Sequence, residues 1–166
     1  AIRDQINPKS YQSVYFSYFD YDALHPVFEG AQTLIPRYAQ IGYVLLVTGI
    51  AKSGRLLEYL NQFNFEIEHM EFNDHHDFTK EDTLAIRERF EQSQSMISGR
   101  KVIITTEKDA MRLTHPDLLD ALDDLPWYYL PIEVKFHNHQ QEEFNEQIEH
   151  YVSTNKINRE FHKRQH

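Results

Sequence analysis

Tyr43-Val-Leu-Leu-Val-Thr48, followed by Gly49, is the stretch of sequence that decides the fold. It is apolar at nearly every position, which is typical of a strand covered on both faces of a sheet. A polar loop follows it, and we expect Ser53 in that loop to cap a helix. Apolar side chains then recur at helical spacing, at Leu56, Leu57, Leu60 and Phe63. The stretch therefore predicts a strand, a loop and a helix, the repeating unit of a parallel sheet.

The same alternation continues along the chain. Further strands are predicted over residues 13–18, 65–72, 101–106 and 127–134, and further helices over residues 84–97, 110–113 and 140–152. Thr79 and Asp82 resemble a capping box at the start of the helix over 84–97. Pro131 interrupts the last strand. The pattern predicts a three-layer α/β/α domain with a mainly parallel sheet, right-handed crossovers, and ligands near the carboxyl ends of the strands.

We expect a linker segment with a strand over residues 1–40, an α/β lobe over 41–155 and a polar tail over 156–166. The chain begins at Ala1 rather than Met, and we expect it to be part of a longer protein.

Composition excludes several classes of protein. With 40% hydrophobic and 13% aromatic residues, the 166-residue chain is too apolar to be disordered. Its net charge of -9 opposes binding to phosphate polyanions, so we expect no nucleic-acid partner. The longest apolar run is far shorter than the roughly 20 residues that cross a bilayer. The absence of cysteine excludes disulfides and thiolate zinc sites, and it is compatible with the reducing cytoplasm.

Polar segments follow three of the predicted strands: Thr48-Gly-Ile-Ala-Lys-Ser-Gly-Arg55, Asn73-Asp-His-His-Asp77 and Thr105-Thr-Glu-Lys-Asp109. In a parallel sheet these segments meet at one edge, where functional groups are expected.

The first segment has the glycine spacing of a Walker loop, but Arg55 and Leu56 stand where such a loop has Lys and Ser or Thr. It predicts either a tight turn that exposes Lys52 and Arg55, or an anion site at the start of the helix.

The second segment places Asp74, His75, His76 and Asp77 together. These residue types are typical of a metal site or of general acid–base chemistry, and the alternative is a polar loop that caps the next helix. His137 and His139 also have the spacing of ligands, but without nearby partners they indicate a solvated loop.

The third segment contains Glu107, Lys108 and Asp109. These residues form either a surface run of ion pairs or part of a functional site, and their position directly after a buried strand favours a functional role. Trp127, Tyr128 and Tyr129 carry no interleaved basic residues and are expected to cover the sheet.

The segments Leu46-Val-Thr-Gly-Ile-Ala-Lys-Ser-Gly-Arg-Leu56, Phe72-Asn-Asp-His-His-Asp-Phe78, Ile104-Thr-Thr-Glu-Lys-Asp-Ala-Met-Arg-Leu113 and Trp127-Tyr-Tyr-Leu-Pro-Ile-Glu-Val134 contain these polar residues. In sequence and order they resemble the carboxyl-terminal half of the tetraacyldisaccharide 4'-kinase family. The resemblance implies two α/β/α lobes joined by a β-stranded linker, of which this chain is the carboxyl-terminal one. It also implies transfer of the ATP γ-phosphate to the 4'-hydroxyl of the tetraacyldisaccharide 1-phosphate precursor of lipid A. ATP and Mg²⁺ would be bound mainly by an amino-terminal P-loop lobe that is absent here, so we expect this chain to be inactive alone.

The resemblance carries catalytic roles onto His75 and Asp74, with His75 as the partner of a carboxylate in the amino-terminal lobe. It implies only a place facing the cleft for Thr106, Glu107, Lys108 and Asp109, and we add Lys52 and Arg55 as further candidates. No metal ligands are expected among these residues. Ser53 departs from the family, which usually has Pro at this position, and this makes the turn less rigid.

The family resemblance also implies a peripheral enzyme on the cytoplasmic side of the inner membrane. Because this chain is acidic and lacks a basic amphipathic helix, we expect the membrane anchor in the other lobe.

Two alternatives remain open from the sequence. A DHH-type phosphoesterase has an Asp-His-His after a strand, although its other motifs are missing. A standalone metal- or protein-binding α/β module would use the 10 histidines.

Overall fold

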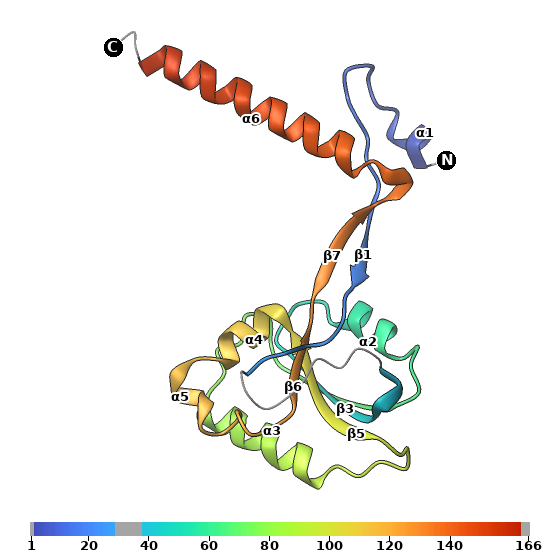
Figure 1. Cartoon of the computed structure of the whole chain (residues 1–166), viewed down its shortest axis with the longest axis vertical. Helices are drawn as coiled ribbons and strands as arrows, with labels where there is room; N and C mark the ends of the chain where they lie inside the picture. Colours follow the sequence, from blue (N-terminus) through green and yellow to red (C-terminus); the bar gives the residue numbers. More distant parts are fainter. Residues whose placement is uncertain (1, 29–37, 164–166) are drawn as a thin grey trace. The chain divides into compact units, whose positions relative to one another are not determined.

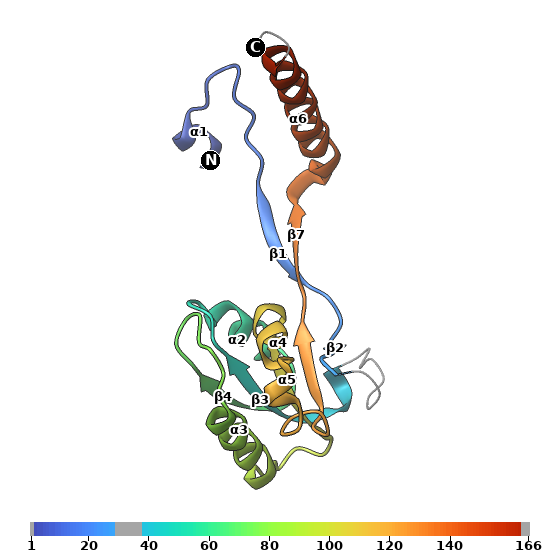
Figure 2. The same ribbon diagram turned by 90° about the vertical axis from the view of Figure 1, so that its left-hand side faces the viewer.

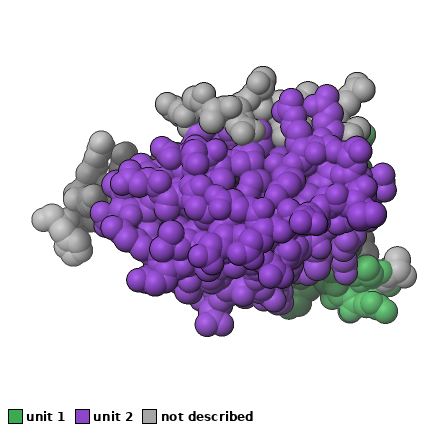
Figure 3. Space-filling model, turned by 90° about the horizontal axis from the view of Figure 1, so that it is seen from below, with its two compact units in different colours: residues 1–20, 132–166 green, residues 21–131 purple. Residues whose placement is uncertain are grey.

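The computed structural model describes residues 2–28 and 38–163. The chain divides into two compact units, residues 21–131 and residues 1–20 with 132–166, which Figure 3 shows in different colours. The lobe expected over residues 41–155 therefore combines residues of both units.

The larger unit is built on a five-stranded sheet with the strand order β2-β6-β5-β3-β4. Its strands are β2 (His25–Pro26), β3 (Ile41–Thr48), β4 (Glu66–Glu71), β5 (Arg100–Thr106) and β6 (Trp127–Leu130). The pairs β3–β4, β3–β5 and β5–β6 are parallel, and β2 pairs with β6 in the antiparallel direction. The sheet is thus mainly parallel, as the sequence predicts.

Helices cover both faces of this sheet, and β3 lies between β4 and β5 with every residue buried (Figures 1 and 2). On one face, Val44 and Leu46 pack in a cluster with residues of α2 (Gly54–Leu60). On the other face, Tyr43, Leu45 and Val47 pack in a cluster with residues of α3 (Lys80–Gln92), α4 (Glu107–Leu113) and α5 (Pro116–Leu119). Alternate side chains of a strand point to opposite faces, so the continuous apolar run buries both sides of β3. The three-layer α/β/α prediction is confirmed.

Two helices begin earlier than the sequence predicts, α3 at Lys80 rather than residue 84 and α4 at Glu107 rather than residue 110, and one of the two predicted caps is absent. Thr79 and Asp82 form the predicted capping box of α3, in which each side chain bonds the backbone of the other residue. Ser53, in contrast, makes no capping hydrogen bond to α2, and its hydroxyl donates to Glu71 Oε1 at 2.5 Å. The predicted Ser53 cap is therefore wrong, because a carboxylate on the neighbouring strand binds the hydroxyl instead. The helix predicted to reach residue 97 ends at Gln92.

The strand predicted over 127–134 is split. After β6, Pro131 has no N–H to continue the ladder, and β7 (Ile132–Phe136) joins β1 (Ser17–Tyr21) in a separate two-stranded sheet. The first strand begins later than the predicted range of 13–18.

The smaller unit contains that two-stranded sheet with helices α1 (Ile2–Ile6) and α6 (Gln141–Lys163) and a short 3-10 turn at His137–His139. Tyr15 donates a hydrogen bond to Gln147 at 2.8 Å, and its ring packs edge-on against Phe136 and Phe144. Helix α6 is longer than the helix predicted over 140–152, since it continues through part of the segment expected to be a polar tail. Within residues 2–28 and 38–163, no helix is both long and apolar enough to cross a membrane.

Candidate active site

The carboxylate of Asp109 organises the carboxyl edge of the sheet. Its side chain is fully buried and accepts hydrogen bonds from the Gly49 N–H at 2.9 Å and the Thr106 hydroxyl at 2.7 Å. Thr106 ends β5 and caps α4, because its Oγ1 accepts the Asp109 N–H at 3.1 Å. Arg112 Nη1, one helical turn further on, lies 3.3 Å from Asp109 Oδ1. A buried carboxylate is costly unless such donors satisfy it, and these donors fix the end of β3 relative to α4.

Gly49 transmits this arrangement to the loop that follows β4. Its carbonyl accepts the His75 N–H at 3.1 Å, while its own N–H is held by Asp109. His75 adopts a φ of 60°, in the left-handed region that non-glycine residues seldom occupy. The backbone of His75 is therefore held in an unusual conformation at the strand edge.

The His75 side chain is 69% exposed and is surrounded by charged groups. Arg112 Nη2 lies 3.2 Å from its Nδ1, and Lys108 Nζ lies 3.4 Å from both ring nitrogens. Asp74 Oδ2 lies 3.7 Å from its Nε2. The structure thus brings together the second and third sequence-predicted segments.

His76 has the opposite environment from His75. Its ring stacks on Phe72 at 4.8 Å between centroids and meets Phe78 edge-on at 5.2 Å. His76 Nε2 lies 2.9 Å from Asp82 Oδ2, the carboxylate that caps α3. Partial burial, the largest single influence, raises the pKa of Asp82, but the hydrogen bonds from His76 and Thr79 outweigh it, and the pKa is lowered. His76 therefore anchors the loop, whereas the neighbouring His75 side chain is mostly exposed.

The remaining candidates divide into buried and exposed groups. Thr106 and Asp109 are buried and bond to each other, whereas Glu107 and Lys108 are exposed. Lys52 and Arg55 are exposed in and beside the loop between β3 and α2.

Comparison with known proteins gives the family. The model of the family "Tetraacyldisaccharide-1-P 4'-kinase" matches residues 17–153. The chain belongs to the tetraacyldisaccharide 4'-kinase family. Membership of this family decides against the DHH-type phosphoesterase and the standalone module.

Relatives in this family share much of the sequence but are longer. The tetraacyldisaccharide 4'-kinase of Phocaeicola vulgatus is 41% identical over 162 residues, which are 97% of this chain and 43% of the relative. That of Bacteroides thetaiotaomicron is 38% identical over 172 residues, 99% of this chain and 44% of the relative. A solved structure of LpxK from Aquifex aeolicus in complex with ATP is 16% identical with a TM-score of 0.47, covering 89% of this chain and 40% of that one. The chain spans less than half the length of these relatives.

Sequence reasoning missed two residues of this site, Gly49 as a link between segments and Arg112 as a contact of His75. Arg112 stands three positions after Asp109 on α4, a spacing that places both on one side of the helix. This spacing could have indicated from the sequence that Arg112 lies beside Asp109. Arg112 also lines a cavity of about 360 Å³ with Asp77, Phe78, His115, Asp117 and Leu118.

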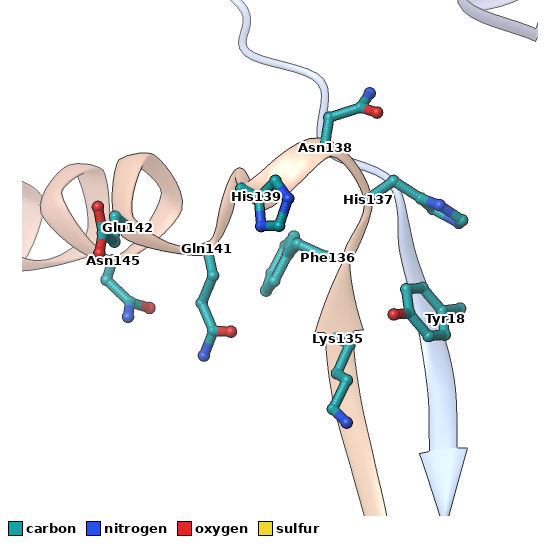
Figure 4. A pocket seen from close by; sticks show the side chains of 9 residues that line it. All are labelled: Tyr18, Lys135, Phe136, His137, Asn138, His139, Gln141, Glu142 and Asn145. Carbon is teal, nitrogen blue, oxygen red and sulfur yellow. The ribbon is translucent and has the colours of Figure 1, made fainter.

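His137 and His139 lie in the smaller unit, beside a hollow of about 790 Å³. Figure 4 shows the His137 ring near Tyr18 and the His139 ring on the other side of the turn, so the two imidazoles do not converge. Among the described residues, no group of three or more His, Asp or Glu side chains is arranged to hold a metal ion.

The Asp109 contacts predict a large effect on stability. Asp109→Ala should lower the free energy of unfolding by about 3–5 kcal/mol, because it leaves the Gly49 N–H, the Thr106 hydroxyl and Arg112 without their partner. The exposed Asp123→Ala is the matched control and should stay within about 0.5 kcal/mol of the parent in urea unfolding. Equal effects of the two changes would contradict this reading.

The close packing around Gly49 predicts that alanine has opposite effects on stability at Gly49 and at Gly54. A Cβ there would meet Asp109 Oδ1 at 3.2 Å and His76 Cβ at 3.4 Å, so Gly49→Ala should destabilise the fold by about 1–3 kcal/mol. At Gly54, the first residue of α2, a Cβ meets nothing within 4 Å, and Gly54→Ala should stabilise by about 0.4–1 kcal/mol. Thermal melting of both variants checks the sign of each change, and a stabilising Gly49→Ala would refute the tight contact.

Proposed function

We propose that this chain forms the carboxyl-terminal part of a kinase that transfers the γ-phosphate of ATP to the 4'-hydroxyl of the tetraacyldisaccharide 1-phosphate precursor of lipid A. The observation that carries the proposal is the exposed His75 imidazole, held at the carboxyl edge of a parallel sheet in a chain of this family. Ligands of open α/β sheets bind at this edge.

In this proposal His75 acts on the reacting hydroxyl through a carboxylate supplied by the amino-terminal lobe. Phosphoryl transfer depends mainly on positioning and electrostatics, and an imidazole that hydrogen-bonds a carboxylate base orients it toward the sugar hydroxyl. Asp74, whose carboxylate lies beside His75 Nε2, helps to orient the ring. The exposed Lys108, Lys52 and Arg55 would add positive charge at the same edge, and Glu107 is a further cleft-facing candidate.

The residues present here do not fit a binding site for ATP and Mg²⁺. Arg55 and Leu56 follow Gly54 where a phosphate loop needs Lys and Ser or Thr, and α2 begins at Gly54 itself. We therefore assign ATP and Mg²⁺ mainly to the amino-terminal lobe, and we propose that this chain alone is inactive.

We further propose that the full-length enzyme acts as a peripheral protein on the cytoplasmic side of the inner membrane, where its lipid substrate would lie. The net charge of -9 opposes binding of this chain to anionic headgroups, so the anchor is assigned to the other lobe.

Two neighbouring histidines provide the main test. In the full-length enzyme, His75→Ala should lower kcat by about 10²- to 10⁴-fold, the usual contribution of acid–base groups, with a much smaller change in KM for ATP. Its melting temperature should change little, because the side chain is mostly exposed.

His76→Ala is the matched control with the opposite expectation. It removes the stacking on Phe72 and the bond to Asp82, so it should lower the melting temperature while kcat at a permissive temperature stays close to the parent value. If His76→Ala reduces kcat more than His75→Ala does at equal folded fraction, the assignment of the catalytic histidine is off by one residue.

Calorimetry with ATP tests the division between the lobes. Titration of this chain with ATP and Mg²⁺ should give no saturable heat at micromolar concentrations, since no loop within residues 2–28 and 38–163 combines a phosphate cradle with its lysine. The full-length enzyme under the same conditions is the positive control. Saturable binding to this chain alone would show that the nucleotide site lies in this lobe and that its assignment to the amino-terminal lobe is wrong.

A further inference from the structure

We propose that Arg112 is a positioning residue that holds the His75 imidazole with Nδ1 as a hydrogen-bond acceptor and the ring proton on Nε2. This inference rests on the proposed function, because it concerns how His75 is prepared for its role. Arg112 lies in the segment Ile104–Leu113 that resembles the family, but the resemblance gives it no role, and the inference rests on its contacts with Asp109, Gly49 and His75.

The guanidinium of Arg112 is held in place by Asp109 and Gly49. Its Nη1 donates toward the buried Asp109 carboxylate at 3.3 Å and lies 3.5 Å from the Gly49 carbonyl. The side chain is only 23% exposed, although it ends at the protein surface. A guanidinium is planar and its donors form a rigid fork, so fixing Nη1 also fixes the direction of Nη2.

Nη2 then determines which nitrogen of His75 carries the proton. It lies 3.2 Å from Nδ1, and a guanidinium can donate but not accept. Nδ1 must therefore accept, and the neutral ring carries its hydrogen on Nε2. Lys108 also can only donate, but it lies 3.4 Å from both nitrogens and does not distinguish between them.

The backbone and the ring of His75 are positioned by the same group of residues. The His75 N–H donates to the Gly49 carbonyl, and the Gly49 N–H donates to Asp109, the partner of Arg112. The backbone and the ring of His75 are thus both linked to the buried carboxylate of Asp109, the backbone through Gly49 and the ring through Arg112. This linkage fixes where Nε2 points relative to the end of β3.

The chemical consequence is a defined direction for the Nε2–H. In this tautomer His75 presents a donor, and the Asp74 carboxylate lies on that side of the ring. During transfer, the proton of the attacking hydroxyl passes to the carboxylate base as the oxygen bonds to the γ-phosphorus, and the bond to ADP breaks. His75 keeps its own proton and donates a hydrogen bond to that base. Arg112 acts only through His75 and is not itself a catalytic residue.

A double-mutant cycle in the full-length enzyme tests the positioning role. Arg112→Met should lower kcat by about 10- to 100-fold, the same range as the loss of a partner that orients a metal-ligating histidine, with little change in KM for ATP. In the His75→Ala background the same change should have almost no further effect on kcat, because its target is gone. Arg89→Met, at an exposed arginine of α3, is the matched control and should leave kcat unchanged.

Arg112→Lys covers the case in which Arg112→Met does not fold. A lysine keeps the charge beside Asp109 but has no fork to reach His75 as well, so it should restore stability and only part of kcat. Full kcat in Arg112→Lys, or independent multiplicative effects of Arg112→Met and His75→Ala, would overturn the positioning role.

Nitrogen NMR of the ¹⁵N-histidine-labelled full-length enzyme provides a readout that does not depend on activity. The parent should show a pyridine-like Nδ1 and a pyrrole-like Nε2 for His75, identified by its absence in His75→Ala. In Arg112→Met both signals should move toward values averaged over the two tautomers. A pyrrole-like Nδ1 in the parent would overturn the inference. If His75→Ala leaves kcat unchanged, the proposed catalytic role fails, while the spectrum still decides whether Arg112 sets the tautomer.

Discussion

The buried carboxylate of Asp109 is the constraint on which the candidate site depends. A charge with no solvent exposure needs donors on every side, and here the Gly49 N–H, the Thr106 hydroxyl and Arg112 provide them. These donors come from the end of β3, the end of β5 and the body of α4. Satisfying one charge therefore fixes three elements at the edge of the sheet where ligands of this fold class bind.

This constraint separates the roles of two adjacent histidines. His76 is directed inward, where Phe72 and Phe78 pack against its ring and Asp82 bonds it. His75 is directed outward, and its left-handed backbone is held by the Gly49 carbonyl. His76 thus stabilises the loop, and the proposed function gives the chemical role to His75. The parallel sheet makes this possible, because it brings loops that are distant in sequence to the same edge.

The parts of the structure that local physics determines were predictable from the sequence. The apolar run of β3 indicated a strand buried on both faces, and Thr79 with Asp82 indicated the cap of α3. The errors arose where a distant partner decides, as at Ser53, whose hydroxyl binds Glu71 on the neighbouring strand. Residue types after a strand indicated the group from Asp74 to Asp77, and only the family resemblance singled out Asp74 and His75 within it. Arg112 was not singled out, because its importance comes from contacts with His75 and Gly49, which lie far away in sequence.

The most direct measurement is a structure of the full-length enzyme with an unreactive ATP analogue and its lipid disaccharide acceptor. We predict that His75 Nε2 lies about 2.6–3.2 Å from a carboxylate that contacts the 4'-hydroxyl, or from that hydroxyl itself, while Arg112 remains on Nδ1. An imidazole of His75 that points into solvent, with the acceptor hydroxyl far from this edge of the sheet, would contradict the central claim.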